Sequence, residues 1–274
     1  MFKGALFAIS FSSALLCICP QKSYGENMFP NNPVNQSESE EISPVIAARI
    51  NFYLSMAPAQ VHTSEAFAWF TGLPSSFFNT VLHFSYKRDI KENIDALIAK
   101  ASPDNSISFF VHPFNTDLVP ILKEKGFRYI GQFQSMSWNV QPISPSQLNI
   151  QLAHVKEFLS NLAISYNLHN DIVEQFTPLL ERSTAENYLV YLAGKSVGTG
   201  SLFVNGKHGL VLHIGTLPDY QRQGVGHAMM HSLMHRAFSL GLEKLVLYCP
   251  SHVERFYTSL GFTREFEIEI YELD

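Results

Sequence analysis

The chain has 274 residues, of which 46% are hydrophobic and 16% are charged, and its formal net charge at pH 7 is −5. This is the composition of a globular chain that can bury a core, and the lack of any basic block excludes the electrostatic footprint of a nucleic-acid-binding protein. Cys249 is the only cysteine after residue 27, so that part of the chain can form no intramolecular disulfide.

Residues 1–27 have the layout of a secretory signal peptide, with Lys3, an apolar run over residues 4–19 and a polar segment after Pro20. The run is too short for a comfortable transmembrane helix. The alternative is a mis-called start, with Met28 as the true one. Contact with a membrane is expected only if residues 4–19 are retained.

The elements that follow can be taken in chain order. Residues 28–43 are polar and acidic and predict a flexible leader. Hydrophobic spacing and turn residues then predict a helix at 44–54, a strand at 77–84, a helix at 89–100, a strand at 107–111, a helix at 118–125 that stops at Gly126, and a β segment at 127–140.

The end of the chain repeats part of this order. Residues 245–249 predict a strand, residues 253–260 a helix, and Gly261 with Phe262 leads into a closing β segment. Two copies of strand, helix, Gly-Phe and strand suggest an internal repeat. Residues 141–146 contain two prolines and two serines and predict a linker. We therefore expect two domains, at 44–140 and 147–274.

The second domain contains a glycine-rich turn at residues 220–227. An apolar strand leads into this turn and an amphipathic helix leaves it. Gly224 and Gly226 let the backbone turn tightly, and the unpaired N–H groups of the first helical turn suit a phosphate. The turn is not a dinucleotide fingerprint, because Met229 replaces the third glycine, and the P-loop Gly-Lys-Ser/Thr is absent.

The pattern that does match is Gln/Arg-x-x-Gly-x-Gly/Ala, here Gln221, Gly224 and Gly226. With its surroundings it resembles the GNAT superfamily of acyl-CoA-dependent N-acyltransferases. Residues 214–220 resemble the family's fourth strand and following turn, and residues 256–262 its late tyrosine helix and Gly-Phe ending.

The resemblance covers residues 147–274 well and 44–140 only loosely. It implies an α/β (α+β) fold with a mixed, mostly antiparallel twisted sheet flanked by helices. A smaller, degenerate GNAT-like domain would precede the catalytic one. This first domain lacks the glycine loop and the tyrosine, so we expect it not to bind acyl-CoA and to form one wall of the acceptor pocket.

The same resemblance implies acetyl-CoA as the acyl donor. Its pantetheine would pair with the main chain at Ile214 and Thr216, where the strand parts from its neighbour near Gly215. Its pyrophosphate would lie on the backbone N–H groups of Gln221, Arg222, Gln223, Gly224, Val225, Gly226 and His227. The alternative for Gly215 is a glycine that only relieves crowding, and the alternative for the turn at 220–227 is a glycine-rich turn without a ligand. We expect no metal, although histidines recur one helical turn apart, because no third-ligand motif accompanies them.

Two residues are candidates for the chemistry. Tyr257 stands where the family's tyrosine protonates the departing CoA sulfur, the alternative being a ring packed under the Gly-Phe turn. His213 is a candidate base, the alternative being a structural role, because its side chain should point to the face opposite Ile214. Cys249 could carry the acyl group, but nothing nearby would lower its pKa, so direct transfer is simpler.

The predicted function is N-acetyl transfer from acetyl-CoA to a primary amine of a small molecule or peptide. The alternative is a non-catalytic acyl-CoA-binding regulatory module. The sequence leaves open whether the protein forms a homodimer. Because acyl-CoA is an intracellular metabolite, we expect a cytoplasmic location, with export or anchoring through residues 1–25 as the alternative.

Overall fold

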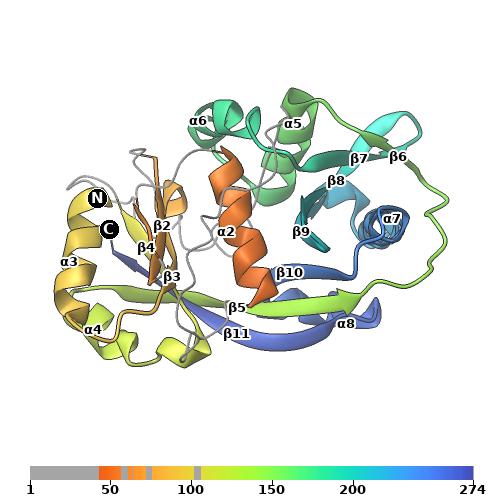
Figure 1. Ribbon diagram of the computed structural model, residues 1–274. Coiled ribbons are helices and arrows are strands. Elements are labelled where there is room, and N and C mark those ends of the chain that lie inside the picture. The colour runs from red at the N-terminus through yellow and green to blue at the C-terminus, as the bar shows by residue number, and fades with distance from the viewer. Residues whose placement is uncertain (1–42, 57–60, 64, 72–75, 102–105, 274) are drawn as a thin grey trace.

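The computed structural model describes residues 43–56, 61–63, 65–71, 76–101 and 106–273 (Figure 1). The helices are α2 (Pro44–Met56), α3 (Ile90–Ala101), α4 (Leu118–Glu124), α5 (Val155–Tyr166), α6 (Asn170–Leu180), α7 (Val225–Ser239) and α8 (Glu254–Ser259). The strands are β1 (Val61–His62), β2 (Ala66–Phe70), β3 (Asn79–Phe84), β4 (Ile107–Val111), β5 (Arg128–Asn139), β6 (Asn149–Leu152), β7 (Glu186–Leu192), β8 (Lys195–Asn205), β9 (His208–Thr216), β10 (Lys244–Pro250) and β11 (Thr263–Leu273).

The strands form one sheet in the order β1-β2-β3-β4-β11-β5-β10-β9-β8-β7-β6. Neighbouring strands are antiparallel except for the parallel pairs β3–β4 and β9–β10. The predicted fold class, a mixed and mostly antiparallel sheet flanked by helices, is therefore confirmed.

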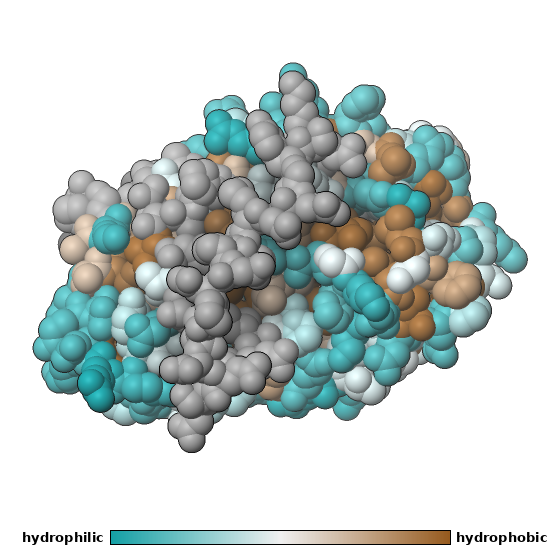
Figure 2. Space-filling model, viewed as in Figure 1, coloured by the Kyte–Doolittle hydropathy of each residue, from teal (hydrophilic) through white to brown (hydrophobic). Residues whose placement is uncertain are grey.

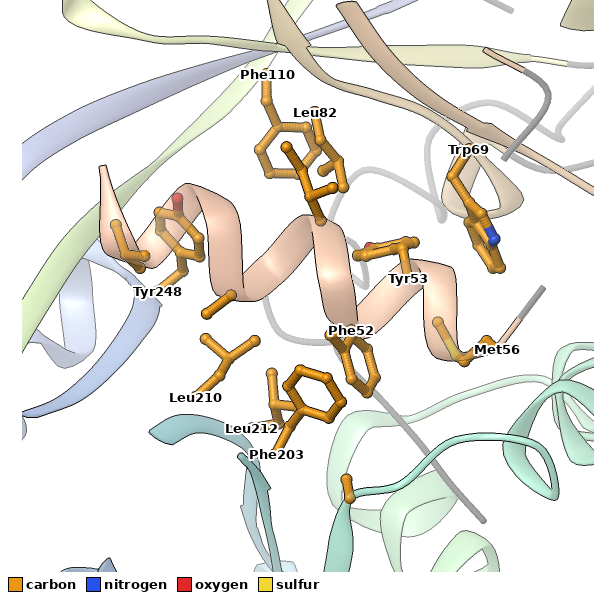
Figure 3. Packing of buried hydrophobic residues seen from close by; sticks show 14 of the residues in the cluster. Phe52, Tyr53, Met56, Trp69, Leu82, Phe110, Phe203, Leu210, Leu212 and Tyr248 are labelled. Carbon is orange, nitrogen blue, oxygen red and sulfur yellow. The ribbon is translucent and has the colours of Figure 1, made fainter. Parts of the chain in front are cut away.

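The two faces of the sheet are covered by different helices, because alternate residues of each strand point to opposite faces. Leu210 and Leu212 of β9 pack in one core with α2, α5 and α6, whereas Val211 packs with α7 on the other face. Helix α2 lies across the first face, with Leu82 and Phe110 on one side and Leu210 and Leu212 on the other (Figure 3). It therefore packs against strands from both halves of the chain.

The last strands of the two halves are exchanged. β5 belongs to the first half but pairs with β10, while β11, at the end of the chain, pairs with both β4 and β5. The two copies of the predicted repeat, β4–α4–β5 and β10–α8–β11, thus complete one continuous sheet. The division into domains at 44–140 and 147–274 stays a prediction, and these pairings join the parts that it separates.

The two Gly-Phe turns, at Gly126 and at Gly261, have the same backbone conformation and corresponding neighbours. Gly126 and Gly261 both adopt the left-handed conformation, with φ of +90° and +89°. A Cβ added to Gly126 would lie 3.6 Å from Leu273 near the end of β11, and one added to Gly261 would lie 3.5 Å from Trp138 near the end of β5. Each glycine turn is therefore covered by the last strand of the other half.

The signal-like segment 1–27 and residues 28–42 of the expected leader lie outside the described residues, so the expectations about location stay predictions. Within the described residues, no helix combines the length and the apolar character needed to cross a membrane. In the view of Figure 1, apolar residues reach the surface in the region of β9 and α7 (Figure 2).

Candidate active site

The backbone pairing between β9 and β10 stops part of the way along the two strands. They are paired only where residues 244–246 face residues 208–210. Beyond this point β9 continues to Thr216 alongside β8, and β10 continues to Pro250 alongside β5. The strands therefore part over the segment that the sequence assigned to donor binding.

β9 carries a bulge at the point where it has left β10. Between Leu212 and Gly215 it has one residue more than the paired segment of β8, and His213 there has φ of +58°. The bulge is thus centred two residues before Gly215. Gly215 itself permits a close approach, because an added Cβ would lie 2.7 Å from Thr199 Oγ1 and 2.9 Å from Ser165 Cβ of α5.

The turn before α7 has the backbone conformation that its glycines suggested. Gly224 immediately precedes the helix with φ of +82°, and Arg222 has φ of +58°. A Cβ on Gly224 would meet no described atom within 4 Å, so glycine is favoured here by conformation and not by crowding. A Cβ on Gly226 would lie 3.4 Å from Phe256 Cζ, which brings α8 close to the start of α7.

A cavity of about 730 Å³ lies where the strands part. Gln223, one of the predicted donor-binding residues, is not among those that line it, and its Nε2 donates to the Asp219 carbonyl over 2.9 Å. The other predicted site residues all line the cavity: His213, Ile214, Thr216, Gln221, Arg222, Gly224, Val225, Gly226, His227 and Tyr257.

Tyr257 of α8 lies in the cavity wall with 8% of its surface exposed. Its ring packs edge-on against Phe256 and Phe262, with centroids 4.9 and 6.0 Å apart. Its hydroxyl has no hydrogen-bond partner within the part of the chain that the structure describes. Burial, and then the neighbouring Cys249, raises the pKa of Tyr257 above its usual value. The hydroxyl therefore keeps its proton at neutral pH and can act as a donor.

His213 is buried and belongs to a chain of hydrogen bonds. Ser201 Oγ donates to Asn187 Oδ1 over 2.7 Å and lies 2.9 Å from His213 Nδ1. Because a hydroxyl has one hydrogen, Nδ1 must donate to Ser201, which leaves Nε2 with a lone pair. Nε2 has no partner among the described residues. Burial holds the pKa of His213 well below its usual value, so the ring is neutral at pH 7.

The lining of this cavity, as far as the structure describes it, includes no aspartate or glutamate. Burial, and then Glu254, raises the pKa of Cys249 to about 12, so this cavity-lining residue is a thiol and not a nucleophilic thiolate. Among the described residues, no three His, Cys, Asp or Glu side chains are grouped so that they could hold a metal.

The cavity lining also includes four Phe and Tyr residues that were not predicted as site residues: Phe133 of β5, Tyr166 of α5, Tyr248 of β10 and Phe256 of α8. The Tyr166 hydroxyl donates to the Ile214 carbonyl over 3.1 Å, and burial raises the pKa of this tyrosine, so it stays a donor. This hydrogen bond ties α5 to the bulged segment of β9. Phe133 is the only cavity-lining residue from the described part of 44–140, and the expectation that the first domain forms one wall of the acceptor pocket stays a prediction.

Comparison with known proteins gives the family. Residues 156–262 match the model of the Acetyltransferase (GNAT) family. Glucosamine 6-phosphate N-acetyltransferase from Schizosaccharomyces pombe is 35% identical over 75 residues, which span 25% of this chain and 68% of the yeast protein.

Solved structures share the fold at low sequence identity. A GCN5-related N-acetyltransferase from Kribbella flavida has a TM-score of 0.62 at 16% identity, over 83% of this chain and 93% of its own. A tandem GNAT protein from the clavulanic acid biosynthesis pathway has a TM-score of 0.53 at 12% identity, over 74% of this chain and 75% of its own. On the family model, the yeast relative and this shared fold, the chain belongs to the GNAT family of N-acetyltransferases.

Proposed function

We propose that the protein transfers an acetyl group from acetyl-CoA to a primary amine by direct attack within a ternary complex. One observation carries this proposal: the parted strands β9 and β10, the first turn of α7 and Tyr257 border the same cavity. The yeast relative, whose name describes acetyl transfer to an amino sugar, supports the reaction type.

The donor would lie along β9 with its pyrophosphate at the start of α7. The first N–H groups of a helix have no partner inside the helix and carry a partial positive charge, which suits a phosphate. Arg222 would add a full positive charge. The main chain of Ile214 and Thr216, which β10 leaves unpaired, would hold the pantetheine and the thioester.

In the reaction, the amine nitrogen would attack the thioester carbonyl, so that a C–N bond forms and the C–S bond breaks. Tyr257 would give its proton to the departing sulfur. The nitrogen becomes acidic once it is bonded to the carbonyl carbon, and His213 Nε2 would accept its proton. Exchange with solvent then restores both side chains. The raised pKa of Cys249 supports direct transfer over a covalent acyl-cysteine.

The test is a panel of primary amines incubated with acetyl-CoA and the full chain, with CoA release followed by a thiol reagent and products identified by mass. We expect amine-dependent release of CoA together with an acetylated amine. If acetyl-CoA binds but no amine is acetylated, the non-catalytic acyl-CoA-binding module is the better description.

His213→Asn separates the catalytic role of this residue from its structural one. Asparagine tolerates φ above zero and can donate to Ser201, but it has no counterpart of Nε2. We expect kcat to fall about 100-fold, with the KM for acetyl-CoA within about twofold. His208→Asn, on the same strand but outside the cavity lining, is the control.

The pH dependence gives a second readout for His213. Because its pKa is held below the usual 6.5, the neutral form persists at pH 7 and is lost only as the pH falls below that value. We expect kcat of the wild type to decline on this acidic side, and the decline to be absent from His213→Asn. A variant with undiminished kcat would leave His213 with a structural role only.

A further inference from the structure

Arg49, in the middle of α2, is a buried cation that no anion among the described residues balances. It is 3% exposed, and its Nε and Nη2 have no hydrogen-bond partner in the described part of the chain. None of the ion pairs between described residues includes it. A buried charge is normally paired and hydrogen-bonded, because losing its hydration is costly. The proposed mechanism gives Arg49 no task.

Aromatic rings surround the guanidinium. They offset only part of the free energy that it loses with its hydration. Its Cζ lies 4.4 Å from the centre of the Phe110 ring, 4.7 Å from Tyr248 and 5.9 Å from Tyr53. The ring faces attract a cation but offer no lone pair to its N–H groups. Figure 3 shows Phe110 and Tyr248 flanking α2 from the two halves of the chain. The N–H donors thus remain unsatisfied within the cage.

Two more polar atoms without a partner belong to the same face of the sheet. Ser135, directly across from Tyr248 in the β5–β10 ladder, is fully buried, and its Oγ has no partner in the described residues. His112, two residues after Phe110 on β4, also has an unpartnered Nδ1 among them. Burial first, and then His83 and Arg49, lower the pKa of His112 to about 4, so it is neutral and cannot balance or add charge at pH 7.

Arg49 is connected to the active-site cavity through Tyr248, which lies against the Arg49 guanidinium and also lines the cavity. Phe133, on the same face as Ser135 because it is two residues away on β5, lines the cavity too. Behind the aromatic side chains of the cavity wall next to α2 there are therefore a positive charge and a hydroxyl for which the described residues supply no partner. An oxyanion would satisfy both.

We propose that Arg49 and Ser135, which lie buried behind the aromatic wall at this end of the cavity, form an oxyanion subsite for a carboxylate or phosphate group carried by the acceptor amine. The inference rests on the proposed acetyl transfer and specifies its acceptor as an amine that is also an anion. A guanidinium presents several N–H donors in a planar fork, which matches either oxyanion. Helix α2, from the first half of the chain, would in this way select the substrate of the site in the second half.

Matched acceptors test the subsite in the wild-type protein. Glycine with glycinamide and phosphoethanolamine with ethanolamine differ in the anion, and both pairs join the amine panel with acetyl-CoA. We expect kcat/KM to favour at least one anionic member over its neutral partner by about 10- to 100-fold, the discrimination of a buried charged hydrogen bond. The pair with the larger ratio identifies the oxyanion as carboxylate or phosphate.

The variant Arg49→Met should reduce this ratio to within about threefold, chiefly through the KM of the anionic amine, and leave the KM for acetyl-CoA unchanged. Because it removes an unpaired buried charge, its melting temperature should equal or exceed that of the wild type. Arg88→Met, at an exposed arginine of the same half, is the control. Arg49→Lys should keep part of the ratio.

The outcomes separate this inference from the function on which it rests. Acetylation of amines with no preference for the anionic member of either pair would overturn the subsite alone. A preference that survives in Arg49→Met would also overturn it. If no amine is acetylated at all, the proposed function fails and the subsite with it.

Discussion

Replacing Tyr257 by phenylalanine is expected to lower kcat by about 100- to 1000-fold while the Kd for acetyl-CoA stays within about twofold of the wild type. The ring would keep its edge-on contacts with Phe256 and Phe262, so the fold should survive. What is lost is the proton donor for the CoA sulfur, and general acid catalysis contributes about 100- to 10,000-fold. Steady-state kinetics together with calorimetric binding of acetyl-CoA measure the two quantities.

The control for this change is Tyr129→Phe, at an exposed tyrosine that does not line the cavity. It should leave both kcat and Kd unchanged. Full activity in Tyr257→Phe would mean that Tyr257 only packs beneath the Gly-Phe turn, which is the alternative that the sequence left open.

The second large effect is expected from Gly224→Val, which should weaken acetyl-CoA binding by about 10- to 100-fold. Valine at φ of +82° is strained by about 1–2 kcal/mol or more, so the turn would change shape and move the N–H groups before and in the first turn of α7. Loss of one charge-assisted hydrogen bond to the pyrophosphate accounts for that range of affinity. Calorimetry with acetyl-CoA measures it.

Two matched variants make this test specific. Gly194→Val introduces the same residue at φ of +78°, also with no described atom within 4 Å of the new Cβ, in a turn outside the cavity lining. It should lower stability to a similar extent and leave binding unchanged. Gln223→Ala should change the Kd by less than about twofold. Equal, small effects of Gly224→Val and Gln223→Ala would contradict donor binding by the backbone of this turn.

The parts of the fold and site that could be predicted are those that depend on residues close together in the sequence. Gly224 and Gly226 between an apolar strand and an amphipathic helix specify a turn with a left-handed residue, and the structure has Gly224 in that conformation. Gly126 and Gly261 each follow a helix and precede a strand, which is why a repeat was predicted. Spacing alone located these elements, because each depends on neighbours within a few residues.

The parts that could not be predicted depend on contacts between distant segments. The alternation of apolar and polar residues shows which face of β5 is buried. It does not show that the neighbouring strand is β10, so the strand exchange was missed. The bulge at His213 was not predicted, since its position depends on pairing with β8. Nothing in the helical spacing of 44–54 distinguishes Arg49 from a surface arginine, and its burial follows from the rings brought to it by β4 and β10.

Titration calorimetry of the full chain with coenzyme A and acetyl-CoA tests the central claim most directly, namely that the cavity between the parted strands β9 and β10 binds the acyl donor. We predict binding of one molecule per chain, weakened in Gly224→Val and unchanged in Gly194→Val. Folded protein that binds neither coenzyme A nor its acetyl thioester would contradict the account.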